Sequence, residues 1–124
     1  MVRGEAAPSR ADGESHYLTG CLHQERKKHR LAVEEFQLAV ACDPGHAAAH
    51  NGLGVSLDAL GEHEGAVAAY KAALAVDQNR DYVLNNLGYS YLLQDRPDLA
   101  VAYFQKAVAL DGQNRRYRNN LGLA

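Results

Sequence analysis

The sequence predicts an all-α protein, a right-handed superhelix (α-solenoid) of antiparallel helical hairpins. The first observation is a repeat, because Leu53, Leu87 and Leu121 are separated by 34 residues each time. The second is that other residues recurring at this interval are three or four positions apart, which places them on one face of a helix. One hairpin cannot bury both of its faces, so we expect successive hairpins to stack and share a continuous core.

Four positions keep their residue type from repeat to repeat. When each repeat is numbered from 1, glycine stands at position 8, alanine at positions 20 and 27, and an aromatic residue at position 24. The small residues would let two helices approach closely, and the ring would fill the gap between hairpins. The residues are Gly20, Gly54, Gly88 and Gly122; Ala32, Ala66 and Ala100; Phe36, Tyr70 and Phe104; and Ala39, Ala73 and Ala107.

This frame divides the chain into a lead and a repeat domain. Residues 1–12 show no periodicity and contain glycine, proline, serine and charges, so we expect a disordered N-terminal lead. Residues 13–124 form the repeat domain. Its parts are full repeats at 13–46, 47–80 and 81–114 and a partial repeat at 115–124 that supplies only a first helix.

Each full repeat contains two predicted helices joined by a turn. Positions 4, 7, 8 and 11 share a face of the first helix, and positions 20, 24 and 27 share a face of the second. The first repeat is the least regular, with Thr19 at position 7 and His23 at position 11. In the second repeat Gly61 suits a left-handed helix C-terminus, and in the third Pro97 suits the first turn of the next helix.

The recurring positions resemble the tetratricopeptide repeat family, whose repeat also has 34 residues. The resemblance covers residues 13–124. It departs from the family at position 32, where proline occurs only as Pro44, and at position 4, where the family often has tryptophan. Position 4 here holds His16, His50, Leu84 and Arg118. The resemblance implies hairpins whose first helices line a concave groove, with positions 2, 5, 6 and 9 among those that meet a ligand.

Asparagine and tyrosine dominate these groove positions. Each asparagine carboxamide could donate to and accept from one peptide unit of an extended ligand, while Tyr82 and Tyr89 would add apolar area. A solvated face that merely tolerates asparagine is the alternative. The candidate residues are Tyr17, Asn51, Asn85 and Asn119 at position 5, Asn86 and Asn120 at position 6, Tyr82 and Arg116 at position 2, and Tyr89 at position 9.

One subfamily binds the C-terminal carboxylates of chaperones through five such positions. Counted from the second repeat, only Asn86 and the charge of Arg116 agree with that set here, and Val55 stands where the subfamily has asparagine. Two of five positions do not make this binding site. We therefore do not expect a cochaperone.

The residue types that carry catalysis or bind metals show no supporting pattern. His46 and His50 are four residues apart, but no third metal ligand recurs near them in the sequence. Cys21 and Cys42 have no partner motif, and adjacent carboxylates on a helix face different ways. We expect no enzymatic activity, no catalytic residue, no cofactor and no metal.

The charge balance bears on partners and location. Thirteen basic against fifteen acidic residues give a net charge of −2, which argues against a dedicated nucleic-acid binder. The basic run 26–30 is either a solvated turn or a contact for an acidic partner or phosphate backbone. The longest apolar run, 99–104, is far shorter than a membrane span of roughly 20 residues. We expect a soluble, cytoplasmic protein, and the excess of arginine over lysine is compatible with a bacterial source.

The predicted function is that of a non-enzymatic scaffold, which binds a peptide or partner segment in the concave groove. The alternative is an assembly module that self-associates, or stacks on further repeats, through residues 115–124. A third possibility is a piece of an enzyme with N-terminal repeats, such as a glycosyltransferase of the O-linked N-acetylglucosamine type.

Overall fold

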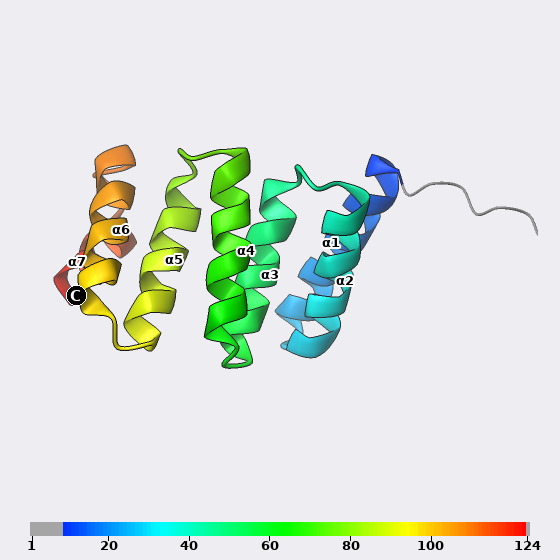
Figure 1. Cartoon of the computed structure of the whole chain (residues 1–124), viewed down its shortest axis with the longest axis horizontal. Coiled ribbons are helices and arrows are strands. Elements are labelled where there is room, and N and C mark those ends of the chain that lie inside the picture. Colours follow the sequence, from blue (N-terminus) through cyan, green and yellow to red (C-terminus); the bar gives the residue numbers. More distant parts are fainter. Residues whose placement is uncertain (1–8, 124) are drawn as a thin grey trace, which may run out of the picture.

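The computed structural model describes residues 9–123, with side chains through 122, and these residues form helices joined by short turns (Figure 1). An all-α solenoid of antiparallel hairpins is therefore confirmed. In chain order the helices are α1 (Arg10–Glu25), α2 (His29–Cys42), α3 (Ala47–Ala59), α4 (His63–Val76), α5 (Asp81–Leu93), α6 (Pro97–Leu110) and α7 (Arg115–Leu123). None of the helices in this part of the chain has both the length and the apolar character needed to cross a membrane.

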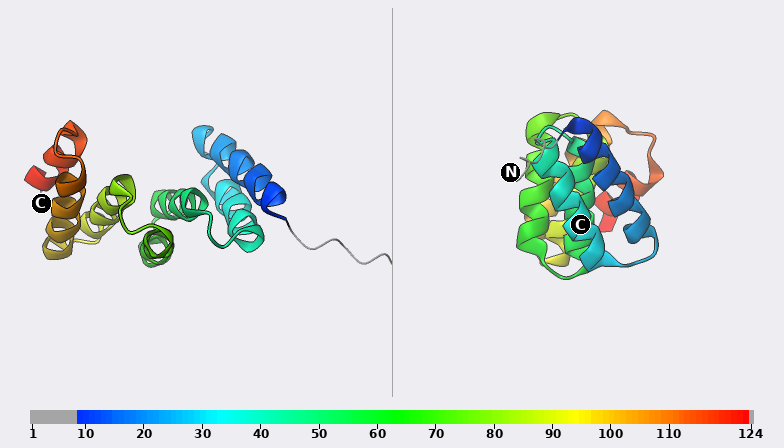
Figure 2. Two further views of the ribbon diagram at one scale, coloured as in Figure 1. Left: turned by 90° about the horizontal axis from the view of Figure 1, so that it is seen from above. Right: turned by 90° about the vertical axis from the view of Figure 1, so that its right-hand side faces the viewer.

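The three hairpins α1–α2, α3–α4 and α5–α6 stand side by side along the long axis, followed by α7 (Figure 1). Successive first helices contact one another, as α1 does α3 and α5 does α7. Within the described residues, successive second helices make no such contact. The array therefore curves, with the first helices on its concave side, and the two ends of the arch rise on that side in the left view of Figure 2.

The recurring glycines and rings form the contacts inside each hairpin. A Cβ added to Gly88 would lie 2.7 Å from the ring of Phe104, and a Cβ on Gly20 would lie 2.7 Å from Phe36. Phe36 also lies 2.6 Å from the Cβ position of Gly52, in the next hairpin. The ring thus fills the space between two hairpins, as predicted, and only a residue without a Cβ fits beneath it.

The turn inside each hairpin has the same backbone geometry. Position 15 of the repeat is left-handed at Lys27 (φ 59°), Gly61 (φ 79°) and Asp95 (φ 58°). The residue after it donates its N–H back into the helix, as Lys28 does to the carbonyl of His23 at 2.8 Å. This pattern ends the first helix and reverses the chain, and glycine adopts it with the least strain.

The N-terminal boundary differs from the prediction. Helix α1 begins at Arg10, so residues 9–12, which we expected in a disordered lead, form its cap and first turn. The reason is a capping box: the Ser9 hydroxyl accepts from the N–H of Asp12 at 3.2 Å, and the Asp12 carboxylate accepts from the N–H of Ser9 at 3.2 Å. The rest of the expected lead, residues 1–8, lies outside the described residues.

Candidate functional site

A hollow of about 500 Å³ lies on the concave side, between α3, α5 and α7. A smaller one of about 320 Å³ adjoins it and shares several of its residues. Six residues predicted from the repeat positions line the two hollows together. They are Tyr82, Asn85, Asn86, Tyr89 and Arg116, with Asn120 in the smaller one.

The apolar part of this concave groove comes mainly from one face of α5. Tyr89 is 46% exposed and Leu93 is 48% exposed, and the two are four residues apart, so their side chains lie on one helical face. Val55 of α3 lines the same hollow. Tyr82 is half-buried, and its hydroxyl accepts a hydrogen bond from Nη1 of Arg80 at 2.7 Å. The groove therefore offers an exposed aromatic and aliphatic strip to a ligand.

The asparagines bond to one another between successive first helices. Nδ2 of Asn86 donates to Oδ1 of Asn51 at 3.0 Å, and Nδ2 of Asn120 donates to Oδ1 of Asn85 at 2.8 Å. Position 6 of one repeat thus pairs with position 5 of the repeat before it. These carboxamides are therefore not fully available to a ligand, because some of their hydrogen-bonding groups already join neighbouring helices. Asn86 keeps its own oxygen and a second N–H for a ligand.

The position 5 residues differ in their surroundings. Asn85 is only 1% exposed although it lines both hollows, because α7 packs beside it and its Oδ1 accepts the hydrogen bond from Asn120. That Asn85 contacts a ligand stays a prediction. Asn51 is half-buried, and Asn119 is exposed near the C-terminal end of the described chain. Neither hollow includes Asn51 or Asn119.

Tyr17 lies away from the two hollows and packs within the first hairpin. Its ring centroid lies 4.6 Å from that of His46 and 6.0 Å from that of Phe36. Burial, and then the neighbouring Cys21 thiol, raise the pKa of Tyr17 to about 12. Tyr17 therefore lines neither hollow, although Tyr82 lies near enough for its charge to contribute to the raised pKa of Tyr17.

At the C-terminal end of the groove, Arg116 is exposed and supplies positive charge. The next residue, Tyr117, is 4% exposed, and its hydroxyl donates to Oδ2 of Asp81 at 2.9 Å. This bond ties α7 to α5. Burial, and then the hydrogen bond to Asp81, raise the pKa of Tyr117 to about 12. The charged side chain of Arg116 is therefore carried on a helix that is fixed against the rest of the array.

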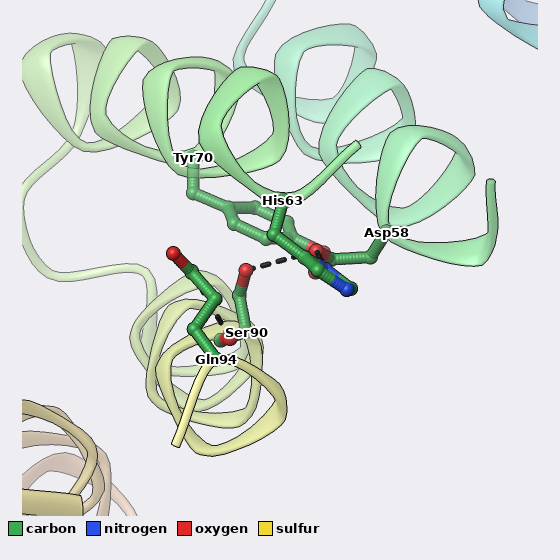
Figure 3. A network of polar contacts seen from close by, with 5 residues as sticks. All are labelled: Asp58, His63, Tyr70, Ser90 and Gln94. Atoms are coloured by element: carbon green, nitrogen blue, oxygen red, sulfur yellow. Dashed lines mark hydrogen bonds and ion pairs between the residues drawn. The ribbon is translucent and has the colours of Figure 1, made fainter. Parts of the chain in front are cut away.

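The half-buried carboxylate of Asp58, which the sequence patterns did not indicate, lines the larger hollow. Figure 3 shows its polar contacts. Oδ1 of Asp58 accepts from the hydroxyl of Ser90 at 2.9 Å and lies 2.8 Å from Nδ1 of His63. The hydroxyl of Tyr70 donates to Oδ2 of Asp58 at 3.1 Å. Because Asp58 belongs to α3 and its partners come from α4 and α5, one carboxylate joins two hairpins. Burial, and then the nearby Asp58, raise the pKa of Tyr70 above its ordinary value.

The order of groups in this cluster bears on its chemistry. Asp58 stands between Ser90 and His63, whereas in a nucleophilic triad the histidine stands between the serine and the carboxylate. The arrangement therefore fits a structural role. Two sequence signals could have located it. Tyr70 is the only hydroxylated ring at position 24, and Asp58 is the only carboxylate at position 12 of the three full repeats.

His46 and His50 engage separate partners. Nδ1 of His46 accepts from the N–H of Ala49 at 3.1 Å, and its Nε2 lies 2.8 Å from Glu14. Nε2 of His50 donates to the carbonyl of Pro44 at 2.8 Å. In the described part of the chain, no group of three histidine, cysteine or acidic side chains could hold a metal ion.

The basic run 26–30 forms the turn between α1 and α2 and begins α2. Arg30 bonds to both carboxylate oxygens of Glu62 at 3.3 Å, with both side chains about half exposed. An exposed ion pair of this kind contributes at most about 1 kcal/mol. The structure therefore places the run at a solvated turn beside the next hairpin.

The chain belongs to the tetratricopeptide repeat family. Models of this family, described as tetratricopeptide repeat, match residues 17–83 and residues 82–114. No curated protein matches the chain.

Solved structures of tetratricopeptide repeat (TPR) domains have the same fold. The first TPR domain of Spaghetti (RPAP3), bound to the HSP90 peptide SRMEEVD, has a TM-score of 0.90 at 13% identity, over 96% of this chain and 94% of that one. The Sgt2 TPR domain from Aspergillus fumigatus has a TM-score of 0.87 at 16% identity, over 98% of this chain and 82% of that one. MamA has a TM-score of 0.78 at 26% identity, over 87% of this chain and 61% of its own.

Proposed function

We propose that the chain is a protein-interaction scaffold that binds a peptide segment of a partner in its concave groove, against α5 and α7. The observation that carries the proposal is the hollow of about 500 Å³ in which Tyr82, Tyr89 and Arg116 meet. Membership of the tetratricopeptide repeat family supports a binding role. The complex of the similar Spaghetti (RPAP3) domain with an HSP90 peptide supports a peptide as the class of ligand.

The chemistry of the groove indicates what such a segment contains. Tyr89 and Leu93 present apolar area to a bulky side chain of the ligand. Asn86 retains a donor and an acceptor for a main-chain peptide unit. Arg116 favours a carboxylate near that unit. The proposed ligand is therefore an extended segment in which an apolar residue lies close to an acidic one.

A paired substitution tests this proposal. We expect Tyr89→Ala with Arg116→Ala to lose partner capture from source lysate by at least about tenfold, because an anchor ring and a charge are removed together. Leu38→Ala with Arg26→Ala is the matched control, because Leu38 is 47% exposed on α2 and Arg26 is exposed at a turn. Captured proteins are quantified by mass spectrometry, and the melting temperature confirms that each variant folds. Equal capture by both variants would contradict the proposal.

Self-association through residues 115–124 remains a second candidate, and one observation favours it. A Cβ added to Gly122 would meet nothing within 4 Å, although the same position at Gly54 and Gly88 lies under a ring. In the described part of the chain, α7 therefore has an uncovered face where a second helix packs in the full repeats. We expect sedimentation to detect concentration-dependent association that Gly122→Arg abolishes. A monomer at all concentrations would exclude this candidate.

The other expectations remain predictions. These are a cytoplasmic location, a bacterial source, and the absence of catalysis, cofactors and nucleic-acid partners.

A further inference from the structure

A second hollow lies on the opposite side of the array, between the second helices α4 and α6. Its volume is about 590 Å³. It forms because the backbones of α3 and α5 lie close together, whereas in the described residues no Cα atom of α4 lies within 8 Å of one of α6. The two hairpins therefore splay apart on this convex side. The lining residues come from the C-terminal parts of the two helices, 71–75 of α4 and 103–110 of α6, so the longer wall extends over about 12 Å.

The floor of this convex cleft is apolar. Leu84 of α5 is 5% exposed and belongs to a buried cluster with Ala107 and Tyr117. Leu74 of α4 and Tyr103 of α6 pack against that cluster and remain half-buried. All three of Leu74, Leu84 and Tyr103 line the cleft. A ligand side chain that enters it would therefore contact an already ordered apolar surface.

The rim of the cleft carries positive charge on both walls. Lys71 is exposed on α4 and Lys106 is exposed on α6, and no acidic residue lines the cleft. Nζ of Lys106 lies 4.9 Å from the ring centroid of Tyr103, directly beside the floor. The residues 34 positions earlier, Gln37 and Ala72, are uncharged. The paired lysines are thus specific to the cleft between the second and third hairpins and are not a feature of the repeat.

We propose that the convex cleft binds an acidic amphipathic helix of a partner protein. A helix that lies along the cleft would place its apolar face on Leu74, Leu84 and Tyr103, as amphipathic helices do in apolar grooves. Acidic residues on its two flanks would meet Lys71 on one wall and Lys106 on the other. This site lies on the side of the array opposite to the concave groove, so it does not depend on the function proposed for that groove, and both could be occupied together.

The test uses a defined probe. It is a fluorescent, helix-stapled peptide of about 14 residues, the length of α4 and α6, with leucines on one face and glutamates on both flanks. We expect fluorescence anisotropy to show binding to the wild-type chain. We expect Lys71→Glu with Lys106→Glu to weaken it by at least about tenfold, since two attractive charges become repulsive. A probe with lysine in place of every glutamate should bind the wild-type chain at least about tenfold more weakly.

Lys27→Glu with Lys28→Glu is the matched control, because it changes the net charge equally at an exposed turn. We expect this variant to bind the acidic probe as the wild type does. A photocrosslinker on the probe should label α4 and α6. Three outcomes would overturn the proposal: no binding to the wild type, equal loss in the control variant, or crosslinks confined to the concave groove. Lysine-dependent binding to vesicles of anionic phospholipid without binding to the probe would also overturn it, in favour of a membrane surface.

Discussion

Helix α5 of the third hairpin and the lone helix α7 carry the same four residues, Asn-Asn-Leu-Gly, at repeat positions 5 to 8, yet these residues have different surroundings. The ring of Phe104 leaves no space for a Cβ at Gly88, whereas a Cβ at Gly122 would meet nothing within 4 Å. Asn85 is 1% exposed, whereas Asn119 is exposed. The difference arises because α5 has helices on both sides, while in the described residues α7 contacts only α5 and α6. A repeat position therefore acquires its packing role only when its neighbours are present.

The largest expected effect separates the two glycines. We expect Gly88→Leu to lower the free energy of unfolding by about 3 kcal/mol, because the new side chain must displace Phe104 where α5 and α6 are closest. Gly122→Leu gains the same helix propensity without any clash. Its free energy of unfolding should therefore lie within about 0.5 kcal/mol of the wild-type value or slightly above it. Urea unfolding measures both. Similar values for the two variants would refute the frame of the repeat.

The two position 5 asparagines give the next contrast. We expect Asn85→Ala to destabilise the fold by about 1–2 kcal/mol, because it removes a buried group and leaves Nδ2 of Asn120 without its acceptor. Asn119→Ala should change the stability by less than about 0.5 kcal/mol, since Asn119 is exposed. Thermal unfolding of the two variants checks this difference. A negligible effect of Asn85→Ala would mean that the carboxamide pair does not hold α7 to α5.

Alkaline pH should also weaken the attachment of α7. The pKa of Tyr117 is raised to about 12, above the ordinary 10, first by burial and then by its bond to Asp81. Its contribution to stability is therefore complete below pH 10 and is lost as the pH rises from 10 to about 12. We expect Tyr117→Phe to lose stability less steeply than the wild type over this interval.

Tyr17→Phe provides the comparison for that experiment, because the pKa of Tyr17 is also raised to about 12, chiefly by burial in the first hairpin. The Tyr17→Phe substitution should reduce the loss of stability at alkaline pH without changing the attachment of α7 to α5. Hydrogen exchange of residues 115–122 at high pH distinguishes the two variants. If Tyr117→Phe has the same pH slope as the wild type, the Tyr117 hydroxyl does not contribute to the attachment.

The periodic part of the fold could be predicted from the sequence, because it depends on contacts that every repeat makes in the same way. Gly88 and Phe104 are one example: each position recurs at a fixed interval, and the packing follows from size alone. The left-handed turn at Gly61 follows from local backbone preference. The capping box of Ser9 and Asp12 is also a local signal in the sequence, but both residues lie outside the 34-residue repeats.

Contacts that depend on the rotation between hairpins could not be predicted in the same way. The sequence places Asn86 and Asn51 on exposed faces, but only the stacking angle brings their carboxamides within 3.0 Å. The bond from Ser90 to Asp58 likewise joins two hairpins and involves residues outside the recurring positions. The splaying of α4 from α6 that opens the convex cleft is also a property of the assembled array.

The most direct test of the central claim is hydrogen exchange of the chain with and without the peptide segment identified from its captured partner. We expect protection at residues 82–93 and 115–122, which carry Tyr89 and Arg116 and line the concave groove. Protection confined to residues 63–76 and 97–110, with 82–93 and 115–122 unchanged, would place the segment on the convex side and contradict the concave-groove proposal.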